Sequence, residues 1–167
     1  MLSSCIGCGV ELEAIEGPVH RYLESSPACW AAYGAVLERE YSDRAYGGVH
    51  RYTVDAYAVQ HPGRRSPQTI QSAAVHLIRL CLMLEEGISA TVAVAAIVAA
   101  AARKADYHWL EPPASRGTLT VAYARAAATP AEHQARVREW AECAWQAWAP
   151  HHAQVRAWLP AAPRRRA

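Results

Sequence analysis

Cys5-Ile6-Gly7-Cys8-Gly9 stands at the start of the chain, and His20 and Ser26-Pro27-Ala28-Cys29 follow it at short intervals. Two cysteines separated by two residues can bind one metal ion, and glycine eases the tight turn around that ion. Cys29 and His20 are the nearest further donors, and they complete a Cys3His set with the spacing C-x2-C-x11-H-x8-C. The predicted Zn²⁺ ligands are Cys5, Cys8, His20 and Cys29.

Ser26 and Pro27 form a helix start, with serine as the N-cap and proline at the first helical position. This start places Cys29 in the first turn, where the helix dipole and the free N–H groups favour a thiolate. Two alternatives to metal binding remain open. Cys5 and Cys8 could be a redox pair, although such a pair normally lies between a strand and a helix of an α/β protein. They could also be small buried residues without a joint role.

The rest of the chain predicts helices and no clear strand. Apolar residues recur at helical spacing, and Ser-Pro, Thr-Pro, Gly and Pro-Gly signals mark the helix ends. Residues 119–128 fit either a short helix or an extended segment. The expected helices are one from Ser26 to about Tyr41, one that starts between Asp43 and Val49 and ends at His61, one from Ser66 to Gly87, one from Ser89 to about Lys104, one from Thr129 to Pro150, and a short one from His151 to Leu159.

These signals predict an all-α fold, a bundle of five or six helices with a loop-rich N-terminal zinc-knuckle segment. We expect one domain over residues 1–160, with residues 1–29 packed on it as the metal-binding segment. Residues 161–167, which include three consecutive arginines, are expected to be a flexible basic tail.

Two features of the predicted bundle concern its packing. The helix from Ser89 to Lys104 is apolar nearly all round, so we expect it either at the centre of the bundle or in an oligomer contact. Trp140 and Trp148 share one helix face and are predicted to be core residues. The pair His151-His152 is expected to be exposed to solvent.

A second polar group lies on the helix that ends at His61 and on the helix that follows it. The candidate catalytic residues are Asp55, His61, His76, Tyr57 and His50. His50 and His61 are about 16 Å apart along one helix, so they cannot bind the same ion. Antiparallel pairing of the two helices would bring His76 near Asp55 or Tyr57, and an aspartate that orients a histidine is a common general-base arrangement. Solvated or backbone-bound histidines are the alternative.

Composition excludes several functional classes. The formal charge of +2 is too small to indicate binding to nucleic acid or to an anionic membrane. No secretory signal or membrane span is visible, and five cysteines cannot all pair internally, so we expect a cytoplasmic protein with reduced thiols. The phosphate-loop, G-x-S-x-G and H-E-x-x-H signatures are absent.

The chain resembles an uncharacterised bacterial family of unknown function. The resemblance rests on five motifs, namely C-x-x-C-G at Cys5–Gly9, G-P-x-H-R-Y at Gly17–Tyr22, S-P-x-C-W at Ser26–Trp30, V-D-A-Y-A-V-Q-H-P-G at Val54–Gly63 and Q-S-x-x-V-H-L at Gln71–Leu77. It covers most of the first ninety residues and implies no activity. It does place His20, Cys29, Asp55, His61 and His76 in one pattern with the knuckle.

Two hypotheses about function follow. The first is a small cytoplasmic zinc-binding helical protein whose metal is structural and which binds a small molecule or a protein partner, with a homo-oligomer as a further possibility. The alternative is a metal-dependent enzyme whose polar site comes from Asp55, His61 and His76. Whether the chain is an enzyme stays open at this point.

Overall fold

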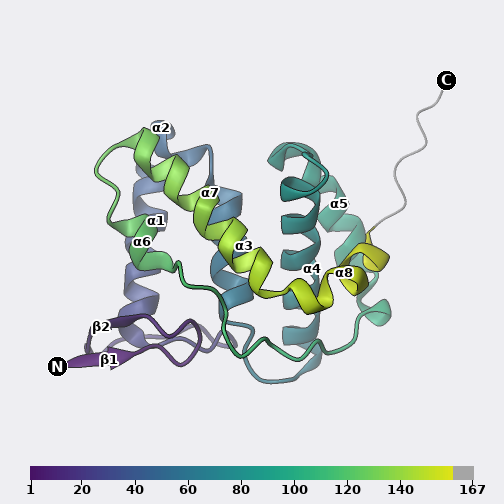
Figure 1. The fold of residues 1–167 in the computed structure, drawn as a ribbon, viewed down its shortest axis with the longest axis horizontal. Helices are drawn as coiled ribbons and strands as arrows, with labels where there is room; N and C mark the ends of the chain where they lie inside the picture. The colour runs from purple at the N-terminus through teal and green to yellow at the C-terminus, as the bar shows by residue number, and fades with distance from the viewer. Residues whose placement is uncertain (160–167) are drawn as a thin grey trace.

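Figure 1 shows a computed structural model of the protein, which describes residues 1–159. Within these residues the chain forms eight α-helices, two short 3-10 turns and a two-stranded sheet. The helices are α1 (Pro27–Ser42), α2 (Arg44–Gly47), α3 (His50–Gln60), α4 (Pro67–Leu84), α5 (Ala90–Ala102), α6 (Val121–Arg125), α7 (Pro130–Ala147) and α8 (His152–Trp158), and the strands are β1 (Leu2–Ser4) and β2 (Glu11–Glu13). The predicted all-α class is confirmed. The predicted basic tail, residues 161–167, lies outside the described residues.

The predicted cap of α5 at Ser89 is confirmed, and so are the three predicted helix starts in which a proline follows the cap. The side-chain oxygen of Ser26 accepts the N–H of Cys29 at 3.2 Å, and that of Ser66 accepts the N–H of Thr69 at 3.1 Å. Thr129 caps α7 in the same way. A proline follows each of these three caps, where its missing N–H costs nothing and its fixed φ suits the first turn. Local sequence therefore determines where α1, α4 and α7 begin.

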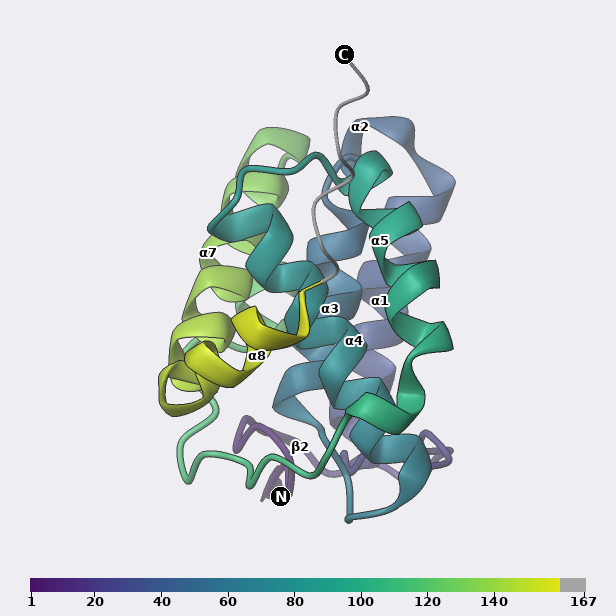
Figure 2. The same cartoon turned by 90° about the vertical axis from the view of Figure 1, so that its right-hand side faces the viewer.

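Helix α3 lies inside the bundle and packs against α4 on one side and α7 on the other, while α1 packs against α2 and α6 (Figures 1 and 2). The core contains the tryptophans of α7 and of the turn that follows it: Trp140, Trp145 and Trp148 are at most 1% exposed. The prediction of a tryptophan core is confirmed. His152, however, is only 8% exposed and its ring stacks on Trp145 at 3.7 Å, so the prediction that it is exposed was wrong.

The N-terminal segment forms a hairpin that the sequence did not indicate. Strand β1 pairs antiparallel with β2, with Leu2 opposite Glu13 and Ser4 opposite Glu11. Each strand has three residues that are exposed or only partly buried, so no alternation of apolar and polar positions could reveal it. The knuckle Cys5–Gly9 is part of the turn that joins the two strands.

Two predicted helices differ from the structure. The helix expected to start between Asp43 and Val49 is divided into α2 and α3, with the break after Gly47. Helix α5 is not central, because only Ala93 and Ala100 are buried and Val92 and Val98 are 61% and 68% exposed. An apolar sequence favours the burial of a helix, but it does not show which neighbouring element covers each of its faces. The oligomer contact stays a prediction.

None of the helices formed by residues 1–159 combines the length and the apolar character that crossing a membrane requires.

Candidate metal centre

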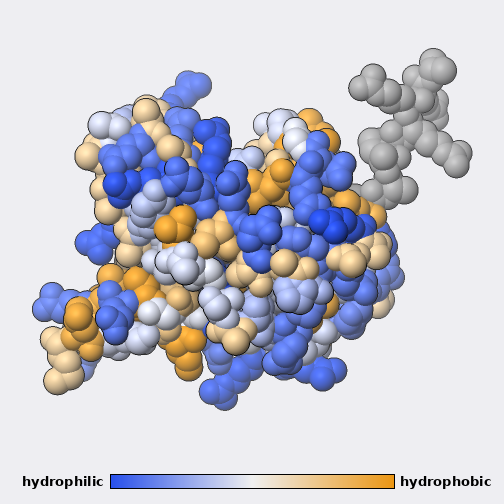
Figure 3. All heavy atoms as spheres, in the orientation of Figure 1, coloured by the Kyte–Doolittle hydropathy of each residue, from blue (hydrophilic) through white to orange (hydrophobic). Residues whose placement is uncertain are grey.

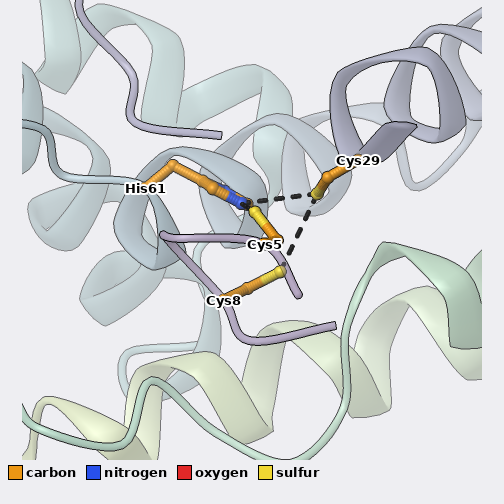
Figure 4. A group of neighbouring side chains, drawn as sticks. All are labelled: Cys5, Cys8, Cys29 and His61. Atoms are coloured by element: carbon orange, nitrogen blue, oxygen red, sulfur yellow. Dashed lines mark hydrogen bonds between the residues drawn. The ribbon is translucent and has the colours of Figure 1, made fainter. Parts of the chain in front are cut away.

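Three cysteines and one histidine converge at the end of the bundle that carries the hairpin. Cys5 and Cys8 come from the knuckle, Cys29 from the first turn of α1, and His61 from the end of α3 (Figure 4). Their four donor atoms all lie within 4.8 Å of one another. Cys5, Cys29 and His61 are at most 3% exposed, so the group is closed off from water on most sides.

The distances within this group fit a tetrahedral cage. The Nε2 atom of His61 lies 3.5 Å from the sulfurs of both Cys5 and Cys29, and the sulfurs of Cys8 and Cys29 are 3.8 Å apart. A tetrahedral ion with bonds of about 2.3 Å to sulfur and about 2.0–2.1 Å to nitrogen requires edges of about 3.8 Å between sulfurs and about 3.5 Å between sulfur and nitrogen. These three of the six donor–donor distances match a four-coordinate metal site, and the other three are at most 4.8 Å.

The knuckle turn is held by backbone hydrogen bonds. The N–H of Gly9 donates to the carbonyl of Cys5 at 2.9 Å, and the N–H of Cys5 donates to the carbonyl of Val10 at 2.9 Å. Gly9 has a φ of +75°, a left-handed conformation that favours glycine. The N–H of Ser26 donates to the Cys5 sulfur at 3.4 Å, which stabilises a thiolate there.

His61 presents the correct nitrogen to the sulfurs. Its Nδ1–H donates to the carbonyl of Tyr57 at 2.7 Å, which leaves the Nε2 lone pair free to bind a metal ion. The Tyr57 ring stacks on the His61 ring at 4.0 Å and fixes its plane. Pro62 follows directly and ends α3, so the imidazole lies at the helix end and not along its side.

The structure brings His61, and not the predicted His20, into the group with the three cysteines. The Nδ1 atom of His20 accepts the N–H groups of Tyr22 and Leu23 at 3.4 and 3.3 Å, and its ring packs against Trp30 at 5.1 Å. His20 is thus engaged in its own turn and stands outside the four-donor group. Proximity in sequence favoured His20, whereas contact between α1 and α3 brings His61 to the cysteines.

The short distances between the thiols shift their pKa values in opposite directions. A hydrogen bond from Cys29 holds the pKa of the Cys5 thiol far below its usual value, and the same hydrogen bond raises the pKa of Cys29. Burial and the nearby Cys29 raise the pKa of Tyr57, whose hydroxyl donates to the Cys29 sulfur at 3.7 Å. Thiols this close cannot all be charged unless a cation lies among them.

A covering loop fixes the knuckle on the core, and nothing in the sequence marked it. The guanidinium of Arg116 donates to the carbonyl of Gly7. The amide of Gln60 donates to the carbonyls of Arg116 and Leu119 at 2.8 Å each, and it accepts the indole N–H of Trp140 at 2.8 Å. The turn that carries two of the four donors is therefore connected by hydrogen bonds to the centre of the bundle.

The predicted catalytic residues do not form one group. Asp55 and His76 do meet, with His76 Nδ1 donating to the Asp55 carboxylate at 2.7 Å. Asp55 is fully buried, however, and Arg79 binds it through two nitrogens, one at 2.6 Å. Tyr57 and His61 belong instead to the cysteine group. The Asp55 carboxylate is thus the centre of a buried ion pair between α3 and α4, and the proposed three-residue enzyme site is not assembled.

His50 belongs to a third polar cluster, which the sequence did not indicate. Its Nδ1 atom lies 2.8 Å from the carboxylate of Glu40, which also contacts His133 Nε2 at 3.0 Å and the hydroxyl of Thr53. Glu40 and His133 are buried, so the cluster connects α1, α3 and α7 through one carboxylate. It holds helices together at the end of the bundle where α2 lies.

The structural role of Asp55 makes a prediction. Asp55→Asn leaves the Arg79 guanidinium buried beside a neutral amide. Such a change typically lowers the free energy of unfolding by about 3–5 kcal/mol. We expect the melting temperature to fall by about 10 °C in differential scanning calorimetry, with the metal content unchanged. The control is Asp106→Asn, because Asp106 is half exposed and pairs with Arg103 at the surface, where such pairs contribute less than about 1 kcal/mol. Equal losses in the two variants would contradict this role.

The comparisons with known proteins give a family and no function. A family described as "Family of unknown function (DUF5946)" matches residues 3–149, a range that contains all four converging donors. No curated protein and no solved structure matches the chain.

Proposed function

The chain belongs to this family of unknown function, DUF5946, and we propose that it is a zinc-binding helical protein whose metal is structural. The observation that carries the proposal is the convergence of Cys5, Cys8, Cys29 and His61, at distances that fit a tetrahedral ion for the three pairs measured. Three thiolates and one imidazole form a Cys3His set, which is a donor set typical of structural zinc.

The number of donors supports a structural metal. Four protein donors complete a tetrahedron, whereas catalytic zinc keeps a position for water or substrate. The ion would join three separate segments, because its ligands come from the hairpin, α1 and α3. Zinc would then fix an N-terminal segment whose own strands bury little apolar surface.

A binding role follows from this arrangement. Four protein donors would fill the coordination sphere of the metal, and Arg79 binds the carboxylate of Asp55. The described residues therefore offer no assembled catalytic group at the metal centre or at Asp55. The protein would therefore hold a small molecule or a protein partner. Within residues 1–159, none of the five cysteines forms a disulfide, which fits a reducing compartment and supports a cytoplasmic location.

Metal analysis of the purified protein tests the proposal. We expect about one zinc per chain by mass spectrometry, and after exchange with Co²⁺ we expect the absorption bands of a tetrahedral cobalt–thiolate site. Cys8→Ser should abolish stoichiometric binding. Cys143→Ser is the matched control. Because Cys143 lies outside the four-donor group, this variant should keep stoichiometric zinc binding. Metal-free protein with five freely titratable thiols would contradict the proposal.

A further inference from the structure

An open pocket of about 450 Å³ lies beside the metal centre, and the structural role of the zinc does not use it. Its walls come from residues 19–25, from residues 64–66 at the start of α4, and from Ile6 of the knuckle. This volume is typical of small-molecule sites. The pocket is the place in the structure where the proposed binding role can be made specific.

The metal centre holds one wall of this pocket. Ile6 lies between the two knuckle cysteines, and Ser25 directly precedes Ser26, whose N–H donates to the Cys5 sulfur. On the other side, Gly63 has a φ of +71°, and a Cβ there would overlap the carbonyl of Tyr22. The segment from residue 19 to residue 25 is thus fixed between the zinc ligands and the turn before α4.

The charges on the pocket favour an anion. Its lining contains three arginines and one glutamate. Arg64 donates to Glu24 at 2.9 Å, whereas Arg21 and Arg65 are exposed and form no ion pair within residues 1–159. The N-terminus of the 18-residue helix α4 begins at the same wall, and its dipole adds positive potential. Two guanidinium groups without an ion pair within residues 1–159 therefore line a pocket whose one glutamate is already bound by Arg64.

The rest of the lining has an apolar part and a polar part that includes one buried hydroxyl without a partner among the described residues. Ile6 and Val19 are 68% and 50% exposed at the rim, and Figure 3 shows hydrophobic side chains gathered at the hairpin end of the molecule. The Ser25 hydroxyl is buried and makes no hydrogen bond of ordinary geometry within residues 1–159, although it lies near enough to Tyr57 to affect the pKa of that phenol. Such a lining suits a ligand with an anionic head and an apolar body.

We propose that this pocket binds a small organic phosphate monoester, with the phosphate toward Arg21, Arg65 and the start of α4 and the apolar body over Ile6 and Val19. Two guanidinium groups offer more donors than a planar carboxylate can use, while a phosphate presents three acceptor oxygens. The start of α4 contributes through its dipole, because the capping box already binds the N–H groups of Ser66 and Thr69. The inference deepens the proposed binding role and rests on it in one respect, namely that zinc holds the wall from residue 19 to residue 25.

Calorimetric titration of the full-length zinc-loaded protein in HEPES buffer tests this proposal. The probes are phenyl phosphate, inorganic phosphate and phenol. Phenyl phosphate should bind about tenfold more tightly than inorganic phosphate, because its ring covers apolar surface, and phenol should not bind measurably. Equal affinity for the two phosphates would show that the protein recognises the anion alone. It would overturn the claim that the apolar body of the ligand contributes to binding. Absence of binding at millimolar phenyl phosphate would overturn the whole proposal.

Variants locate the binding. Arg21→Gln/Arg65→Gln should weaken phenyl phosphate at least about tenfold, since each charge-assisted hydrogen bond is a strong one. The matched control, Lys104→Gln/Arg138→Gln, changes the net charge equally at exposed positions outside the pocket and should stay within twofold. Equal losses in both double variants would mean non-specific charge attraction and would refute the site.

A second variant tests the rim without touching the arginines. Val19→Glu places a carboxylate beside the expected apolar body and should weaken phenyl phosphate severalfold, and unchanged affinity would argue against this pose. Zinc content and melting temperature, measured on every variant, separate this proposal from the previous one. If the protein as isolated holds no zinc, the metal proposal fails by that measurement, and the same titration still decides whether the pocket binds phosphate.

Discussion

Replacing His61 by alanine is expected to abolish the proposed tight binding of zinc, whereas replacing His20 by alanine is expected to leave that binding intact. His61 is fully buried, and its Nε2 atom lies 3.5 Å from two of the three sulfurs. Binding of structural zinc contributes about 10–16 kcal/mol in small domains, so one ligand of four corresponds to about 2.5–4 kcal/mol, or on the order of a hundredfold to a thousandfold in affinity. Loss of the imidazole also leaves a cavity beside Tyr57.

The measurement is competition for zinc against a chromophoric chelator, combined with a thermal melt of each variant. His61→Ala should lose zinc to the chelator at concentrations that leave the unmodified protein loaded, and its melting temperature should fall by at least about 10 °C. His20→Ala should stay loaded, with a small change in melting temperature, since His20 contacts only its own turn and Trp30. The reverse result would restore the ligand set that the sequence suggested.

The cysteine part of the centre was predictable because its signals are local. Two cysteines two residues apart with a following glycine, and a third cysteine in the first turn of a Ser-Pro helix, are features of short segments. The fourth ligand depends on how α3 packs against α1, and no spacing along the chain contains that information. His61 was visible in the sequence at the end of a helix, directly before a proline, but it was assigned to the candidate catalytic residues while the nearer His20 was preferred as the ligand.

The same distinction explains the other differences. The starts of α1, α4 and α7 were predictable, because each cap acts within four residues. The exposure of α5 and the burial of His152 were not, because both depend on which surface a neighbouring element covers. Glu40 and His133 lie 93 residues apart in sequence, and only the packing of α1 against the rest of the bundle makes their contact visible.

Gly7→Ala is expected to disrupt the centre almost as strongly as loss of a ligand, although it removes no donor atom. A Cβ on Gly7 would overlap the imidazole carbon Cδ2 of His61 and the carbonyl oxygen of Glu24. Overpacking in a rigid site typically costs about 1–3 kcal/mol, and here the displaced groups are a metal ligand and a backbone carbonyl, so we expect the upper end of that range. Zinc affinity should fall at least tenfold, and the melting temperature by about 10 °C.

Gly34→Ala is the matched control for this substitution. A Cβ on Gly34 meets nothing within 4 Å, and Gly34 lies inside α1, where alanine favours the helix by about 0.5–1 kcal/mol. The same chemical change should therefore raise the melting temperature slightly at residue 34 and lower it strongly at residue 7. If Gly7→Ala keeps full zinc affinity in the chelator competition, the knuckle does not lie against His61 in the protein. The four-donor centre, which requires that contact, would then be wrong as well.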